Sequence, residues 1–66
     1  MLVNGKELSI QNLSPKNISS VLIFFEISIG TVAVEKNGEI VPKDLYETTI
    51  LDESDKLEII KFVGGG

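Results

Sequence analysis

The chain ends with residues 56–66, which read Lys56-Leu57-Glu58-Ile59-Ile60-Lys61-Phe62-Val63-Gly64-Gly65-Gly66. Leu57 and Ile59 alternate with Glu58 and Ile60, and a period of two is typical of a β-strand. We therefore predict a strand from Lys56 to Val63. It follows a polar turn at Asp52–Asp55 and runs into three glycines without a spacer.

A hairpin is predicted at the other end of the chain. The apolar residues 1–3 are followed by Asn4-Gly5, a dipeptide that accepts the positive φ angles of a two-residue type I′ turn. The returning strand is predicted over Lys6–Ile10, with Leu8 and Ile10 on its buried face.

A second hairpin is predicted in the middle of the chain. Asn37-Gly38 separates a strand at Val32–Lys36 from a short strand at Ile40–Val41. The following segment, Pro42–Tyr46, resembles a loop with a helical turn, in which we expect the ring of Tyr46 to anchor the loop. Thr48–Leu51 is predicted to pair briefly as an edge strand.

One helix is predicted between the hairpins. Its apolar stripe has the spacing i, i+3, i+4 and i+7 and consists of Ile18, Val21, Leu22 and Phe25. The helix could start at Ser14-Pro15 or at a cap formed by Asn17, and the unit ends by Gly30. Ile23 and Phe24 lie off the stripe, and we expect them to fill the rim of a small core; the alternative is that they form a patch for self-association.

The resulting order is strand, strand, helix, strand, short strand, strand. One helix packed on one face of a mixed sheet of four to five strands, with the first and last strands parallel at its centre, buries these elements economically. The sequence therefore predicts an α+β fold of the ubiquitin-like β-grasp type. We expect a single domain over residues 1–63 and a flexible glycine tail over 64–66.

Composition excludes several classes of function. The 66 residues include no Cys and no His, so the usual nucleophiles, general bases and soft metal ligands are missing. Six Lys against ten acidic residues give a net charge of −4, which opposes binding to nucleic acid. The apolar run Val21–Phe25 is too short to span a membrane. We expect a cytoplasmic protein that is not an enzyme.

The glycine tail is the strongest functional candidate. Glycines at a terminus add nothing to a folded core, but fully extended they carry the Gly66 carboxylate roughly 10 Å beyond the sheet. That carboxylate is ionised at neutral pH and is a poor electrophile, so acyl chemistry there requires activation, for which ATP is suited. The alternative is an idle, frayed terminus.

Three stretches of the chain resemble the ThiS family of sulfur carriers. They are Asn4-Gly5, residues 34–42 and residues 55–66. The likeness in length and element order covers essentially the whole chain, and the Phe62–Gly66 ending points to this family among the β-grasp carriers and modifiers.

The resemblance implies that Gly65-Gly66 is the functional end. In this family the residue corresponding to Gly66 is adenylated by a ThiF-like E1-type enzyme that uses ATP and Mg²⁺. It then becomes a thiocarboxylate with sulfur from a donor protein, and a ThiG-like thiazole synthase takes that sulfur to build the thiazole of thiamin. The chain itself is expected to bind no cofactor and no metal.

The last strand has apolar residues on both faces. By analogy with the binding face of ubiquitin-like proteins, we predict that Ile60 and Phe62 dock on the partner enzymes, with Glu58 beside them. The alternative is that Ile60 and Phe62 pack under the segment Pro42–Leu51.

Three other functions remain open at this point. The chain could be the small subunit of a molybdopterin synthase, which uses the same terminal glycine chemistry, or a ubiquitin-like protein modifier. It could also be a non-catalytic β-grasp binding domain in which the glycines have no role.

Overall fold

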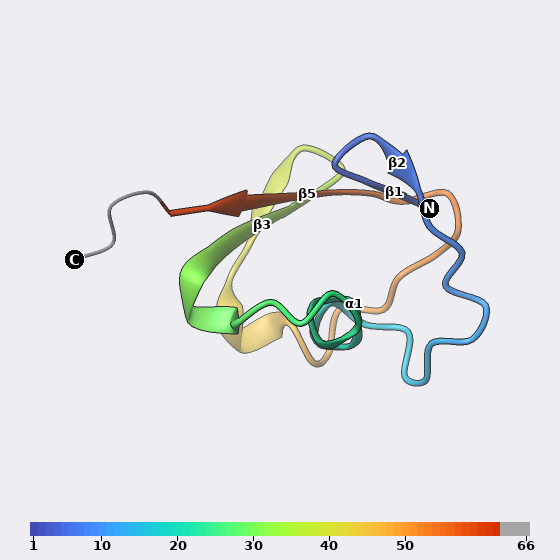
Figure 1. Cartoon of the computed structure of the whole chain (residues 1–66), viewed down its shortest axis with the longest axis horizontal. Coiled ribbons are helices and arrows are strands. Elements are labelled where there is room, and N and C mark those ends of the chain that lie inside the picture. Colours follow the sequence, from blue (N-terminus) through green and yellow to red (C-terminus); the bar gives the residue numbers. More distant parts are fainter. Residues whose placement is uncertain (63–66) are drawn as a thin grey trace.

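The computed structural model describes residues 1–62 (Figure 1). The predicted boundary between domain and tail, at Val63 and Gly64, lies outside this range. The elements are β1 (Leu2–Val3), β2 (Lys6–Glu7), α1 (Ile18–Phe24), the 3-10 turn η1 (Ile29–Thr31), β3 (Val32–Lys36), β4 (Glu39–Val41), the 3-10 turn η2 (Lys43–Leu45) and β5 (Lys56–Lys61). Within residues 1–62, no helix is long and apolar enough to cross a membrane.

The strands form one mixed sheet of five in the order β2-β1-β5-β3-β4. β1 runs parallel to β5, with Leu2 opposite Lys56, and β3 runs antiparallel to β5 on its other side. The helix lies across one face of the sheet (Figure 1). The predicted β-grasp, with the first and last strands parallel at the centre, is confirmed.

Both Asn-Gly turns are confirmed by their backbone angles. Asn4 and Gly5 have φ values of 51° and 82°, and Asn37 and Gly38 have values of 53° and 89°, so each turn has the two positive φ angles that type I′ requires. Two antiparallel hairpins, β1–β2 and β3–β4, result.

The predicted second strand, Lys6–Ile10, was wrong in extent. β2 ends at Glu7, and Leu8 donates a backbone hydrogen bond to the Met1 carbonyl at 2.8 Å. Beyond that point the chain leaves the sheet, and Ile10 enters the core from a loop. The alternation of Leu8 and Ile10 therefore reflects packing beneath the sheet, not pairing within it.

Asn17 is the N-cap of the helix, so of the two predicted starts the one at Asn17 is confirmed and the one at Ser14-Pro15 is wrong. The Asn17 side-chain oxygen accepts the Ser20 N–H at 2.8 Å, and its amide donates to the Glu47 carbonyl at 3.0 Å. The helix ends earlier than Gly30, at Phe24, with Phe25 as the C-cap. Glu26 follows with φ 58°.

The core lies between α1 and the inner face of the sheet. Its buried apolar residues are Met1, Val3, Ile10, Ile18, Val21, Leu22, Val32, Val34, Tyr46, Leu51 and Leu57. Three of the four stripe residues are among them, but Phe25 is partly exposed. Tyr46 is buried in the core, so its ring holds its loop as predicted, and burial raises the pKa of its phenol.

Ile23 and Phe24 do not fill the core rim, so that prediction was wrong. Ile23 is 75% exposed and Phe24 is 57% exposed. A helix of seven residues turns only one narrow stripe toward the sheet. These two side chains project from the other side, and the Phe24 ring packs edge-on against Phe25 with centroids 5.1 Å apart.

Thr48–Leu51 does not form the predicted edge strand. The helical turn before it is present as η2, and the backbone N–H groups of Thr48 and Thr49 both donate back to the Leu45 carbonyl. These bonds prolong the turn and take the donors that a strand would need. Only an isolated bridge between Asn17 and Ile50 follows.

Candidate functional site

β5 places the candidate site at one end of the molecule. It is the middle strand of the sheet, and its C-terminal end lies at the far end of the described chain from the N-terminus (Figure 1). The strand is held up to its last residues, because the Phe62 N–H donates to the Thr31 carbonyl at 3.0 Å. The predicted tail residues Gly64, Gly65 and Gly66 follow this point and lie outside the described range.

The side chains of β5 separate into an inner and an outer set. Leu57 is buried and Ile59 is half-buried on the helix side. Glu58 and Ile60 point to the outer face, as the alternation of a strand requires. Ile60 is 44% exposed and Phe62 is 54% exposed. All three residues predicted to dock are therefore accessible to a partner.

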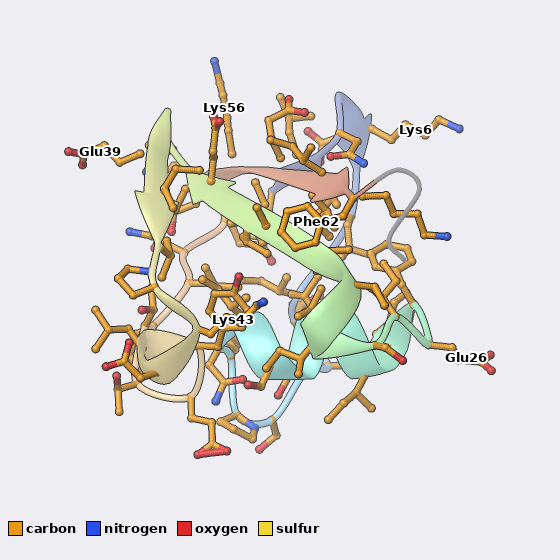
Figure 2. The ribbon with its side chains drawn as sticks, turned by 90° about the vertical axis from the view of Figure 1, so that its left-hand side faces the viewer. Lys6, Glu26, Glu39, Lys43, Lys56 and Phe62 are labelled. Atoms are coloured by element: carbon orange, nitrogen blue, oxygen red, sulfur yellow. The ribbon has the colours of Figure 1, made fainter. Side chains whose placement is uncertain are left out.

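The alternative was that Ile60 and Phe62 pack under Pro42–Leu51. Both are exposed instead, although Lys43 of that segment contacts Phe62. The Lys43 ammonium lies 5.5 Å from the centroid of the Phe62 ring, a cation–π geometry. Figure 2 shows both residues at the end of the molecule where β5 leaves the sheet. The contact orients the ring and leaves more than half of the residue's surface exposed.

Sequence reasoning missed one residue of this surface, Ile40. Ile40 is 61% exposed and lies opposite Glu35, which in turn lies opposite Glu58. Paired residues share a face, so Ile40 extends the outer apolar surface of Ile60. The alternation within Glu39–Val41 is the signal that could have placed it, since Val41 pairs with the buried Val34.

The acidic turn before β5 has both structural and surface carboxylates. Asp55 is almost buried and accepts hydrogen bonds from the Asn37 amide at 2.9 Å and the Asp52 N–H at 2.8 Å. Asp52 is exposed, and the hydroxyl and backbone N–H of Ser54 hold its pKa below the ordinary value. Asp55 therefore stabilises the turn, whereas Asp52 presents charge to solvent.

The described part of the chain, residues 1–62, contains no cluster of three acidic side chains arranged to hold a metal ion. The surface hollows are open and shallow; the two beside α1 and β5 have volumes of about 480 and 590 Å³. Within residues 1–62, this site presents the end of β5 and exposed apolar side chains on the outer face of the sheet.

Comparison with known proteins gives consistent matches. The family model described as the ThiS family matches residues 1–66. The sulfur carrier protein ThiS of Bacillus subtilis is 34% identical over 64 residues, which cover 97% of this chain and 96% of that protein. A crystal structure of the thiamine biosynthesis protein (ThiS) from Geobacter metallireducens superposes with a TM-score of 0.80 and 29% identity, covering 98% of this chain and 96% of that one.

A longer protein also contains a related segment. A thiazole synthase of Paramagnetospirillum magneticum is 39% identical over 67 residues, which cover all of this chain but only 20% of that protein. This chain therefore spans a fifth of that relative. Because the family model and these relatives match nearly the whole chain, and the fold agrees, the chain belongs to the ThiS family of sulfur carriers in thiamin biosynthesis.

Proposed function

We propose that the Gly66 carboxylate is the working group of this protein, and that it is adenylated, converted to a thiocarboxylate and used as the sulfur source for thiazole formation. One observation carries the proposal: the middle strand of the sheet leads directly to the glycines. A rigid strand anchors the tail at Phe62, while side-chain-free residues can thread a narrow channel in a partner.

The chemistry requires two steps on partner enzymes. In the first, a Gly66 carboxylate oxygen bonds to the α-phosphorus of ATP and pyrophosphate leaves. In the second, sulfide-level sulfur from a donor protein forms the C–S bond and AMP leaves with the former carboxylate oxygen. Because the chain has neither Cys nor His, the catalytic groups, ATP and Mg²⁺ belong to a ThiF-like enzyme.

A ThiG-like thiazole synthase is the proposed acceptor of the sulfur. The support is that a segment resembling this whole chain occurs within a protein named thiazole synthase. A carrier and its acceptor joined in one polypeptide meet at high effective concentration, and separate chains would have to meet through a docking surface. We assign Ile60, Phe62 and Glu58 to that surface and place the reaction in the cytoplasm.

The test is intact-mass measurement after incubation with a ThiF-like enzyme, ATP, Mg²⁺ and a sulfur donor. We expect the mass to rise by one exchange of oxygen for sulfur at the C-terminus. A variant lacking Gly65 and Gly66 should fold normally and show no exchange. Gly30→Ala is the matched control, because a Cβ at Gly30 meets nothing within 4 Å, and it should react like the wild type.

Three results would contradict the proposal. Conjugates with lysines of other proteins, with no thiocarboxylate, would indicate a modifier. Transfer of the sulfur to a molybdopterin precursor instead of a thiazole would indicate the other carrier pathway. Full function of the variant without Gly65 and Gly66 in thiamin synthesis would leave the glycines without a role.

A further inference from the structure

β5 has an open edge near its C-terminal end. β1 pairs with β5 only at Lys56 and Leu57, whereas β3 pairs with it from Leu57 to Lys61. Among residues 1–62, the part of β5 from Glu58 onward therefore has a neighbouring strand on one side, that of β3, and none on the other. The open side is the one that faces β1.

The hydrogen bonds establish which backbone groups point to that side. Phe62 donates to Thr31 of the β3 side, and Lys56 accepts from Asn37 there. Residues two apart on a strand point the same way, so the even-numbered residues of β5 bond toward β3. The odd-numbered ones point toward β1, and the Leu57 carbonyl accordingly accepts from the Asn4 N–H at 2.9 Å.

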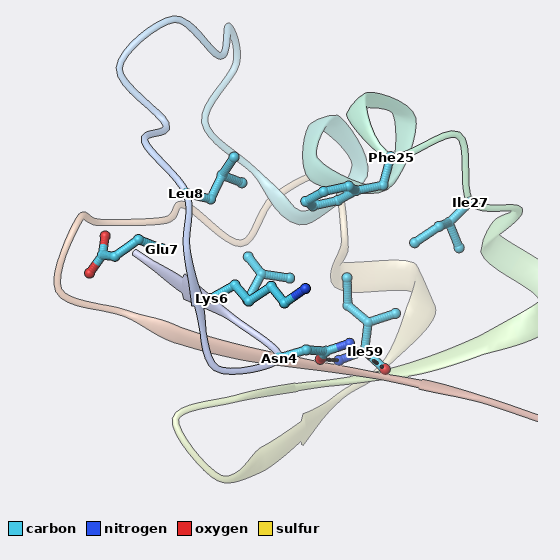
Figure 3. Close-up of a pocket in the computed structure, with 8 residues that line it drawn as sticks. Asn4, Lys6, Glu7, Leu8, Phe25, Ile27 and Ile59 are labelled. Atoms are coloured by element: carbon cyan, nitrogen blue, oxygen red, sulfur yellow. Dashed lines mark hydrogen bonds between the residues drawn. The ribbon is translucent and has the colours of Figure 1, made fainter.

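At Ile59, the next odd-numbered residue of β5, the Asn4 side chain forms the hydrogen bonds that a neighbouring strand would form. The Asn4 side-chain oxygen accepts the Ile59 N–H at 2.7 Å, and its amide donates to the Ile59 carbonyl at 3.3 Å (Figure 3). Lys61 is the odd residue that follows. Its N–H and C=O point to the same side, beyond the reach of β1 and with no strand of the described chain beside them.

A groove with both apolar and polar side chains in its lining runs beneath this edge. Two hollows, of about 480 and 590 Å³, both have Phe25 and Ile27 in their lining. The first extends to Asn4 and Ile59, and the second extends to Lys61. Figure 3 shows Phe25 and Ile27 facing Ile59 across the first hollow. The open edge and the groove therefore lie side by side along β5.

We propose that an extended segment of the activating enzyme adds to β5 at Lys61 and places an apolar side chain in the groove between Phe25 and Ile27. An N–H and a C=O on one residue match the backbone of another extended chain, and strand addition is a common mode of protein recognition. The groove provides a position for every second side chain of such a segment.

The length of the tail indicates which partner lies there, and this step rests on the proposed function. Gly66 is the fourth residue after Phe62, and four extended residues span at most about 14 Å. An enzyme that acts on Gly66 must therefore lie against the end of β5. A second copy of this chain fits less well, because each copy has a net charge of −4 and like charges oppose self-association.

Amide hydrogen exchange measured by NMR tests the proposal on the full chain. In the free protein, the Lys61 amide should exchange rapidly, while those of Ile60 and Phe62 should be protected by β3. Addition of the ThiF-like enzyme without ATP should slow exchange at Lys61. A Lys61 amide that exchanges equally fast in the complex would overturn the proposal, as would protection in the free protein that grows with its concentration.

A pair of variants tests the same edge by affinity. Lys61→Pro removes the N–H on the open side without removing a bond to β3, since proline is tolerated where the N–H of an edge faces solvent. Lys61→Ala removes the charge and keeps the N–H. We expect Lys61→Pro to bind the enzyme roughly tenfold more weakly than Lys61→Ala, with unchanged thermal unfolding. Equal affinities would reject strand addition.

The outcomes also separate this proposal from the proposed function. If the wild-type protein gains sulfur at Gly66 while Lys61 stays unprotected, only the strand addition is wrong. If the wild-type protein is not adenylated at all, the proposed function is wrong and the choice of enzyme fails with it.

Discussion

Glu26 adopts a backbone conformation that residues other than glycine rarely occupy. It has φ 58° directly after the helix C-cap. Its N–H donates to the Ile23 carbonyl at 3.0 Å, and the Ile27 N–H donates to the Leu22 carbonyl at 2.9 Å. This bond pair is the Schellman ending of a helix, in which the position of Glu26 is usually glycine. The backbone of Glu26 is therefore strained, because a residue with a Cβ occupies a position that favours glycine.

Glu26→Gly is expected to stabilise the protein by up to about 1 kcal/mol. Relief of a left-handed conformation is worth roughly 1–2 kcal/mol, from which the greater chain entropy of unfolded glycine subtracts about 0.5–1 kcal/mol. Denaturant unfolding measures the change. Glu26→Ala is the control, since it removes the charge but keeps the Cβ, and it should give no such gain. A less stable Glu26→Gly protein would contradict this account.

At the scale of elements, α1 depends on its N-terminal cap. A helix of seven residues is too short to be stable by itself in water. Asn17 both caps it, through Ser20, and ties it to the loop carbonyl of Glu47. Asn17 is only 5% exposed, so its loss would leave buried backbone groups without partners.

Asn17→Ala is expected to cost about 2 kcal/mol, since a lost cap typically costs ~1 kcal/mol and an unpaired buried group costs a similar amount. Thermal or urea unfolding would measure this. The exposed Asn12 provides the control, because Asn12→Ala removes the same side chain away from any helix start. Equal stability of the two variants would show that the cap contributes nothing.

The elements that sequence reasoning predicted correctly are those specified locally. The two Asn-Gly turns fix their own φ angles, and β5 has a clear alternation, so both hairpins and the last strand could be found. Leu8 and Ile10 alternate equally well, yet they pack in or against the core from a loop. The end of β2 and the turn at Thr48–Thr49 depend on backbone hydrogen bonds to Met1 and Leu45, which the pattern of apolar and polar side chains does not reveal.

For the whole molecule, the outer face of the sheet is the proposed contact with partners. Ile60 lies on it opposite Ala33, and Ile40 extends it from β4. We expect Ile60→Ala to weaken binding to the ThiF-like enzyme by roughly fivefold to tenfold, which corresponds to about 1 kcal/mol of lost apolar contact. Titration of the enzyme with the carrier would measure it.

Ile50→Ala is the matched control for this surface. Ile50 is also an exposed isoleucine, but it lies in the loop that bridges Asn17, outside the five-stranded sheet. Its substitution should leave the affinity unchanged. If both variants bind with wild-type affinity, docking does not use the outer face at Ile60.

The candidate site could be predicted only in part. The exposure of Ile60 and Phe62 could be predicted from the alternation of the last strand, whereas the role of Gly66 stays a prediction. The contact of Lys43 with Phe62 and the open backbone at Lys61 could not be found in this way. They result from where η2 packs and from how few residues β1 contributes to its pairing with β5.

Among residues 1–62, β5 is the last strand and the middle strand of the sheet. Until Lys56–Lys61 have left the ribosome, the β1–β2 and β3–β4 hairpins have no common neighbour. Pairing Leu2 with Lys56 also closes nearly the whole chain into one loop, and such distant pairing is slow compared with local contacts. The sheet should therefore form only after β5 has left the ribosome, when the glycines that follow it in the sequence have already been added.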